Sequence, residues 1–163
     1  RDIEIKNLAS HTLYSTFRAM AVEFDSSPDL YEKMRRIYKV LKDTLWITDF
    51  YYVNAEREMK SVVDGRKLGD VPDIDLLVKD EVFSTNDLNS IGDDYPNLVK
   101  VLKAYEIETF VVCRVGMGPF TFGYIMCAEP RSHRIWQDDE FAILFSLSRM
   151  LAGQIRGAGL KME

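Results

Sequence analysis

The N-terminal part of the chain shows the periodicity of amphipathic helices. Apolar residues at helical spacing predict one helix over about residues 8–24 and a second whose apolar stripe covers residues 30–45. Ser27 and Pro28 stand where the N-cap and the first helical position of the second helix are expected. The opposite face of this helix is charged, and we interpret it as a solvated surface. It consists of Glu32, Lys33, Arg35, Arg36, Lys39 and Lys42.

Two hairpins follow from patterns of period two. Residues 49–55 and 59–63 have the composition of strands and should pair with each other. The second hairpin is the clearest in the sequence, with strands over residues 109–115 and 120–128 joined across the turn 116–119. Both of its faces are largely apolar. It must therefore be covered by helices on one side and by loops and short helices on the other.

The remaining segments complete the order of elements. We expect a short helix over residues 74–78, a short strand over residues 81–85 and a helix from residue 95 to near residue 106. The acidic residues 138–140 suit the positive end of a last helix that runs to about Ile155. The order is helix, helix, hairpin, irregular middle, hairpin, helix. This order indicates an α+β fold and not a series of βαβ units.

Composition places the chain among ordinary globular domains. Its 163 residues are 47% hydrophobic and 29% charged, which suits one compact core. The 21 Lys and Arg residues against 26 Asp and Glu residues argue against nucleic acid as a partner. The most apolar tract, residues 109–128, contains Arg114 and the turn 116–119, so we expect no membrane insertion. We expect a cytoplasmic protein.

Candidate chemistry is sparse. His11 and His133 do not have the spacing of metal ligands, and the carboxylates of residues 138–140 suit a helix dipole better than acid-base catalysis. Cys113 and Cys127 lie in apolar strands, where a reactive thiolate is disfavoured. We therefore expect no catalytic residues, no metal and no cofactor. A thiol enzyme is the strongest enzymatic alternative.

Four tracts carry a resemblance to a known family. They are residues 105–112, 118–125, 131–136 and the pair Asp139 and Glu140 before an apolar helix. In this order they resemble the C-terminal half of a GAF domain, in particular of the GAF domains that precede bacterial GGDEF diguanylate cyclase domains. The resemblance is clear over residues 94–155. Over residues 30–83 only the order of helix and hairpin agrees.

The resemblance implies a GAF/PAS-like central antiparallel sheet with the first, second and last helices on one face. A small-molecule pocket would lie on the other face, under the irregular middle. Bilin-carrying GAF domains attach the chromophore through a cysteine followed by histidine, and residues 84–105 contain neither. Cyclic-nucleotide GAF domains have an Asn-Lys pair and a Phe-x-x-x-Asp-Glu pattern, whereas residues 136–140 of this chain are one residue shorter than that pattern and the Asn-Lys pair is missing. Neither histidine is expected in the pocket, where a haem would need one.

The candidate pocket residues are the aromatic side chains of the strands and one arginine. Aromatic residues on the sheet face away from the long helices would floor the pocket, and Arg114 would meet an anion. Such aromatic stripes also occur in ordinary cores, and an edge arginine also snorkels to solvent. The set is Tyr52, Phe83, Phe110, Arg114, Phe122 and Tyr124.

We expect residues 1–163 to be a single GAF-like sensory domain from a longer multidomain protein. Its core covers about residues 28–155, and the helix over residues 8–24 serves as linker and dimerisation helix. A homodimer would form through an apolar strip of the terminal helices, made by Tyr14, Ile143, Leu147 and Met150. The expected function is binding a small molecule, which enters next to residues 71–95, and controlling a C-terminal output domain. The alternatives are a dimerisation or relay module without ligand, and a thiol-dependent enzyme of the methionine-sulfoxide reductase type.

Overall fold

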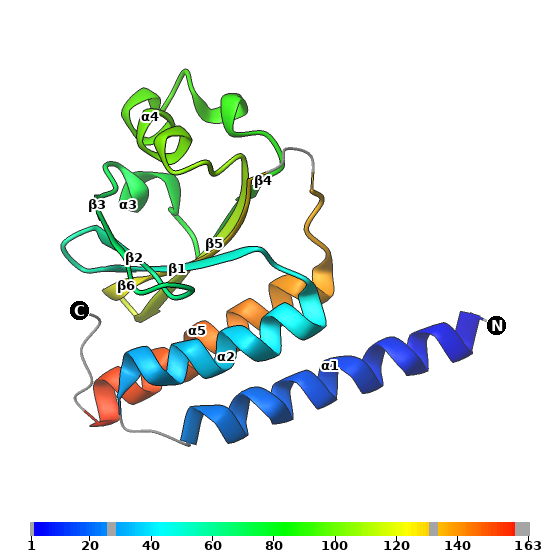
Figure 1. The fold of residues 1–163 in the computed structure, drawn as a ribbon. Helices are drawn as coiled ribbons and strands as arrows, with labels where there is room; N and C mark the ends of the chain where they lie inside the picture. The colour runs from blue at the N-terminus through cyan, green and yellow to red at the C-terminus, as the bar shows by residue number, and fades with distance from the viewer. Residues whose placement is uncertain (1, 26–28, 131–133, 159–163) are drawn as a thin grey trace.

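The computed structural model of the chain describes residues 2–25, 29–130 and 134–158, with side chains from residue 13 onward (Figure 1). The helices are α1 (Asp2–Asp25), α2 (Leu30–Leu45), α3 (Ile74–Leu77), the 3-10 helix η1 (Leu88–Ile91), α4 (Pro96–Ala104) and α5 (Asp138–Ala158). The strands are β1 (Asp49–Asn54), β2 (Glu58–Ser61), β3 (Lys67–Asp70), β4 (Val82–Thr85), β5 (Thr109–Met117) and β6 (Phe120–Glu129). The predicted order of helices and hairpins is confirmed. Within the described ranges, no helix has the length and apolar character needed to cross a bilayer.

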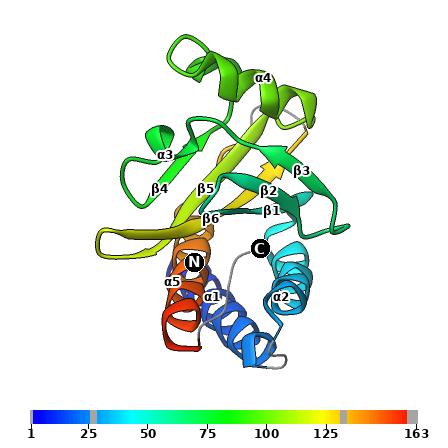
Figure 2. The same ribbon diagram turned by 90° about the vertical axis from the view of Figure 1, so that its left-hand side faces the viewer.

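All strands join one antiparallel sheet in the order β3-β2-β1-β6-β5-β4 (Figure 2). The two predicted hairpins meet where β1 pairs with β6, with Tyr52 opposite Ile125. The central position of β6 and β5 agrees with their apolar faces, because strands inside a sheet are covered on both sides. The α+β class with a central antiparallel sheet is therefore confirmed.

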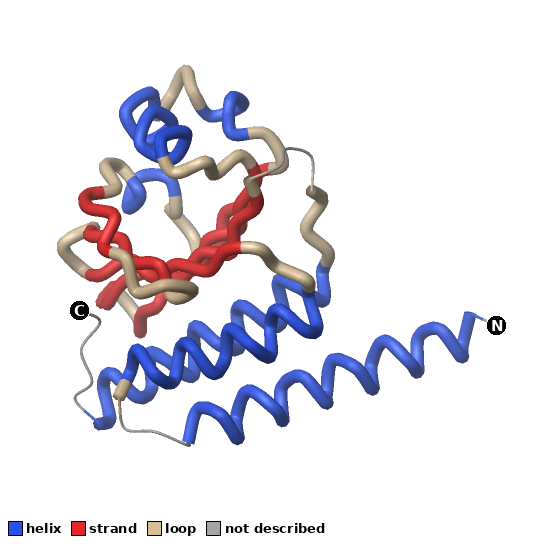
Figure 3. Tube along the Cα trace, viewed as in Figure 1, coloured by secondary structure: helices blue, strands red, loops and turns tan. Residues whose placement is uncertain are grey.

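Helices cover the two faces of the sheet unequally (Figures 1 and 3). The long helices α2 and α5 pack on one face, while α3, η1 and α4, which we call the roof, cover the other. α1 does not lie on the sheet as expected. It forms an outer layer against α2 and α5, into which it inserts Met20 and Phe24. A core therefore fills each side of the sheet, one under the long helices and one under the roof.

The strip expected to form a dimer is mostly buried within the chain. Ile143 and Leu147 lie inside the core under the long helices, and Met150 packs against that core. Only Tyr14 is exposed, at 65% of its surface. The apolar face of α5 that looked too wide for one contact is wide because α5 packs against the sheet on one side and α1 on another.

The beginning of α2 differs from the prediction in its cap. Its N-cap is Asp29, whose carboxylate accepts a hydrogen bond of 2.9 Å from the backbone N–H of Glu32. Ser27 and Pro28, the predicted cap and first helical residue, lie outside the described residues.

Lys33 is buried, although its position in a charged run predicted a solvated side chain. It is only 5% exposed, its Nζ donates to the backbone carbonyl of Phe24, and its Nζ lies 4.9 Å from the centre of the Phe24 ring. α1 has no basic residue in its last turn. Lys33 therefore supplies the positive charge that the C-terminal carbonyls of α1 favour, and it fixes α1 to α2.

Sequence reasoning missed the edge strand β3 and the helix η1. The β3 segment Lys67–Asp70 contains one apolar residue, Leu68, because an edge strand with little buried surface needs no alternating pattern. It is placed by the turn at Gly65, whose φ of 75° is open to glycine without strain.

Arg134 joins three elements on the side of the long helices. Its guanidinium forms ion pairs with Glu129 at the end of β6 and with Glu140 in the first turn of α5, both at 2.5 Å. It also donates to the backbone carbonyls of Leu45 and Trp46, where α2 ends. One side chain thus holds together the ends of α2 and β6 and the beginning of α5. From the sequence, Arg134 was instead expected to belong to a solvated basic loop.

Candidate ligand site

Three of the predicted site residues lie on the face of the sheet that the roof covers. Phe110 and Tyr124 are buried there, and Phe83 is half-buried against them. The ring centres of Phe83 and Phe110 are 6.1 Å apart, which is a usual separation for packed aromatic rings. Over the middle of this face the roof is packed tightly, since Leu88, Leu98 and Leu102 are fully buried.

Tyr52 was assigned to the wrong face. It belongs to the core under the long helices, whereas its neighbours Tyr51 and Val53 point to the roof. The reason is the pairing of β1 with β6, which sets Tyr52 opposite Ile125 and Tyr51 opposite Met126. Because directly opposed residues share a face, a shift of one residue would exchange the two tyrosines. The short strand itself carries no signal for that choice.

Phe122 also points to the side of the long helices, contrary to the prediction. Strict alternation would put it on the same face as Tyr124. The pairing of β5 with β6 shifts, however, so that Val115 faces Gly123 and Gly116 faces Thr121, which leaves Phe122 as the extra residue of a β-bulge. Bulges re-aim a side chain in this way. Phe122 packs at the margin of the core under the long helices.

Arg114 is used for structure at the end of the β5–β6 hairpin. Its Nε donates to the hydroxyl of Thr121 at 2.8 Å, and its Nη2 donates to the carbonyls of Gly118 at 2.5 Å and Phe120 at 3.1 Å. Its Nη1 forms an ion pair of 3.2 Å with Glu81, the residue before β4. The guanidinium therefore ties the hairpin turn to the chain before β4.

A cavity of about 460 Å³ opens beside this arginine, where the roof ends. One wall comes from α3 and the loop after it, through Asp75, Val78, Lys79, Asp80 and Glu81. The other wall comes from the hairpin, through Arg114, Gly118, Pro119, Thr121 and Tyr124. We call it the hairpin cavity. It brings together Arg114 and Tyr124 of the predicted set with acidic residues that no pattern in the sequence singled out.

Tyr124 lies at the boundary between this cavity and the core under the roof. Burial raises the pKa of its phenol, the negative charge of Asp75 raises it further, and the positive charge of Arg114 opposes them. Both charged residues line the cavity, so the phenol end of Tyr124 is directed toward it. Only 5% of the surface of Tyr124 is exposed, and none of the described residues forms a hydrogen bond with its hydroxyl.

The cysteines are placed as the sequence indicated. Cys113 and Cys127 are both buried and reduced, in the core under the long helices. Burial raises the pKa of the Cys113 thiol to about 12 and that of Cys127 well above its ordinary value. A nucleophilic cysteine needs an accessible thiolate, and neither side chain provides one.

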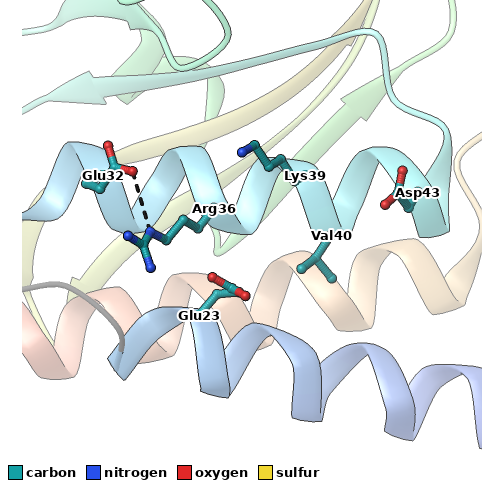
Figure 4. A pocket seen from close by; sticks show the side chains of 6 residues that line it. All are labelled: Glu23, Glu32, Arg36, Lys39, Val40 and Asp43. Atoms are coloured by element: carbon teal, nitrogen blue, oxygen red, sulfur yellow. Dashed lines mark hydrogen bonds and ion pairs between the residues drawn. The ribbon is translucent and has the colours of Figure 1, made fainter.

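Another pocket, of about 360 Å³, lies between α1 and α2 (Figure 4). It is lined by Glu23, Glu32, Arg36, Lys39, Val40 and Asp43. Arg36 and Glu32 form an ion pair of 3.4 Å, with both side chains about 40% exposed. Its charges are mixed and solvated, which agrees with the interpretation of this face of α2 as a surface.

Comparison with solved structures identifies the fold. The GAF domain of a phosphoenolpyruvate-protein phosphotransferase from Coxiella burnetii is similar with a TM-score of 0.67 and 16% identity, over 91% of this chain and 95% of that chain. The corresponding domain from Acinetobacter gives a TM-score of 0.64 and 13% identity, over 90% and 94%. The phycocyanobilin-bound GAF domain of a cyanobacterial phytochrome gives a TM-score of 0.65 and 14% identity, over 89% of this chain and 96% of that chain.

Sequence comparison adds nothing to this result, since no family model and no curated protein sequence matches the chain. The similar structures include GAF domains of two phosphotransferases and a bilin-bound GAF domain of a phytochrome. This chain has the fold of GAF domains.

Proposed function

We propose that the chain is a non-catalytic sensory domain that binds a small molecule in the hairpin cavity and controls an attached output domain. A diguanylate cyclase of a bacterial cytoplasmic signalling protein is the output that the resemblance of residues 94–155 favours. The observation that carries the proposal is the hairpin cavity itself, which lies between α3 and the β5–β6 hairpin and is lined by Tyr124, whose hydroxyl forms no hydrogen bond with any described residue. Fold alone does not give a function, whereas a concave site with convergent polar groups indicates binding.

A ligand in this cavity has a short physical connection to α5. Glu81 lines the cavity, forms the ion pair with Arg114, and lies 3.7 Å from Arg149 of α5. A ligand that moves the loop after α3 changes the position of Glu81 between these two arginines. For signalling the ligand must bind two arrangements of α5 unequally, and a difference of a few kcal/mol is enough.

The test is a thermal-shift screen of the protein against small metabolites, followed by hydrogen exchange with each hit. A ligand at about 100 times its dissociation constant should add about 2.7 kcal/mol of stability. Protection is expected first in residues 71–105 and at the hairpin turn, and then in α5. Protection confined to the groove between α1 and α2, or conversion of a hit to product, would contradict the proposal.

A relay module without ligand is the second candidate, and one feature of α1 favours it. Tyr14 and Val22 are 65% and 63% exposed and lie two helical turns apart on the outer side of the molecule. A homodimer through this face of α1 would pass a change from one terminal helix to the next domain. Light scattering of the protein and of its Val22→Glu variant tests it, since the variant should be monomeric if this face holds the dimer.

Attachment of a bilin, as in the phytochrome domain of the comparison, is not part of the proposal. The chain has two cysteines, and both side chains are buried on the side of the sheet opposite to the roof. A thioether to either sulfur would require the sheet to open.

A further inference from the structure

The charged groups of the hairpin cavity are unequally available to a ligand. Its cations are Arg114 and Lys79, and its anions are Asp75, Asp80 and Glu81. Arg114 already makes four contacts with protein oxygens through its three nitrogens. A guanidinium has five N–H donors, so little of its donor capacity is left for an incoming anion. The role first expected of Arg114, recognition of an anion, is thus taken by the protein itself.

The carboxylates of the cavity, in contrast, are still available to bind a ligand. Glu81 is paired with Arg114, but Asp75 is exposed and forms no ion pair or hydrogen bond with any side chain that the structure describes. Because Arg114 and Glu81 compensate each other, the remaining charges are Asp75, Asp80 and Lys79. Their formal sum is negative.

We propose that the hairpin cavity binds an organic cation, a primary ammonium or guanidinium group on a short apolar or aromatic body. The cation lies against Asp75 and the hydroxyl oxygen of Tyr124, and the body lies against Val78 and Pro119. This inference rests on the proposed function, because it names the chemical class of ligand for that same site.

The hydroxyl of Tyr124 is a second, independent feature that supports the hairpin cavity as a ligand site. Its side chain is nine-tenths buried, and its hydroxyl lacks a protein partner within the described ranges. The hydroxyl oxygen itself is not among the buried side-chain atoms without a partner in the described residues, so it is reached from the cavity and its hydrogen-bonding capacity is available to a ligand. The phenol oxygen accepts a hydrogen bond from an ammonium, and the charge of Asp75, which lines the same cavity, favours a cation over an anion.

The size of the cavity limits the ligand. A volume of about 460 Å³ is in the lower half of the range of about 300–1,000 Å³ that small-molecule pockets occupy. A single ring with one amino group fits this volume.

The experiment compares benzylamine, benzyl alcohol and benzoate, which carry the same ring with a positive, a neutral and a negative head. Each is titrated into the isotopically labelled protein at constant ionic strength, and two-dimensional NMR spectra follow the backbone amides. Benzylamine should shift the signals of Asp75, Thr121 and Tyr124 in a saturable way. Benzoate should leave these signals unchanged, and benzyl alcohol should bind at least about fivefold more weakly than benzylamine.

Variants test the two contacts directly. Asp75→Asn and Tyr124→Phe should each weaken benzylamine binding by about five- to tenfold. Asp94→Asn changes an exposed aspartate between η1 and α4, outside the cavity, and is the matched control that should leave the affinity unchanged. Asp75 is exposed, so its replacement should leave the fold intact.

The possible failures are distinguishable. If benzoate or benzyl alcohol shifts these amides as strongly as benzylamine does, or if Asp75→Asn binds as well as Asp94→Asn, the cation class is wrong while the site of the proposed function stands. If no probe shifts any amide of the cavity at saturating concentration, both the cation class and the hairpin cavity as ligand site are wrong.

Discussion

Replacing Arg134 by alanine should be among the most destabilising single changes at a polar residue of this domain. The guanidinium is 22% exposed, and its partners Glu129 and Glu140 are 11% and 12% exposed. Deleting it leaves two nearly buried carboxylates without their cation and two backbone carbonyls at the end of α2 without their donor. Breaking a buried ion pair by removing one partner is unfavourable by about 3–5 kcal/mol.

Because the arginine keeps some contact with solvent, we expect the lower end, about 3 kcal/mol. In a domain of this size that corresponds to a melting temperature lower by about 6–12 °C. Urea unfolding followed by far-UV circular dichroism is the assay, because Trp136 lies 4.2 Å from the guanidinium and its fluorescence would respond to the substitution itself. Arg134→Lys should lose part of this stability, since an ammonium cannot form the same forked contacts.

The matched control is Arg149→Ala. Its ion pair with Glu81 measures 3.7 Å, and the two side chains are 47% and 40% exposed, so the expected loss is below about 0.5 kcal/mol. If the two alanine variants have the same midpoint in urea, Arg134 does not hold the ends of α2, β6 and α5 together, and the reasoning is refuted.

Three further predictions follow from single residues. Burial, and then the charge of Glu129, raise the pKa of Asp49 above its ordinary 3.8, so ionising it destabilises the folded state. Asp49→Asn should therefore raise the melting temperature at pH 7, and the gain should vanish below the unfolded pKa; an equal gain at pH 3 would contradict this. With a pKa of about 12, the thiol of Cys113 is ionised in roughly one molecule in ten thousand at pH 8, so native Cys113 and Cys127 should react with a thiol reagent only as fast as the protein opens. Labelling at the rate of a free thiol would contradict the burial of these two cysteines. Gly116→Ala should destabilise the hairpin by about 1–3 kcal/mol, since a Cβ there would lie 2.4 Å from the carbonyl oxygen of Phe120 and 2.8 Å from the Arg114 guanidinium carbon. Gly153→Ala, with no atom within 4 Å, is its control in chemical unfolding.

Local patterns of residues were sufficient to predict the helices and strands other than β3 and η1, and the burial of the central hairpin on both faces. Helical periodicity located α2 and α5, and the apolar faces of β5 and β6 required cover on both sides of the sheet. These are local properties, because the period of a helix or strand is fixed by its own backbone. The burial of Cys113 and Cys127 followed from the same local pattern.

Which of these residues come into contact depends on the tertiary structure. Tyr51 instead of Tyr52 faces the roof because of the register of β1 on β6, and Phe122 turns away because of a bulge on β6. Lys33 is buried because α1 ends beside it, which no periodicity in α2 reveals. Asp75 and Tyr124 come together in the hairpin cavity from segments far apart in the chain. Register, bulges and contacts between layers depend on residues distant in sequence. The fold class could therefore be predicted from local patterns, whereas the complete set of residues of the ligand site could be identified only from the three-dimensional structure.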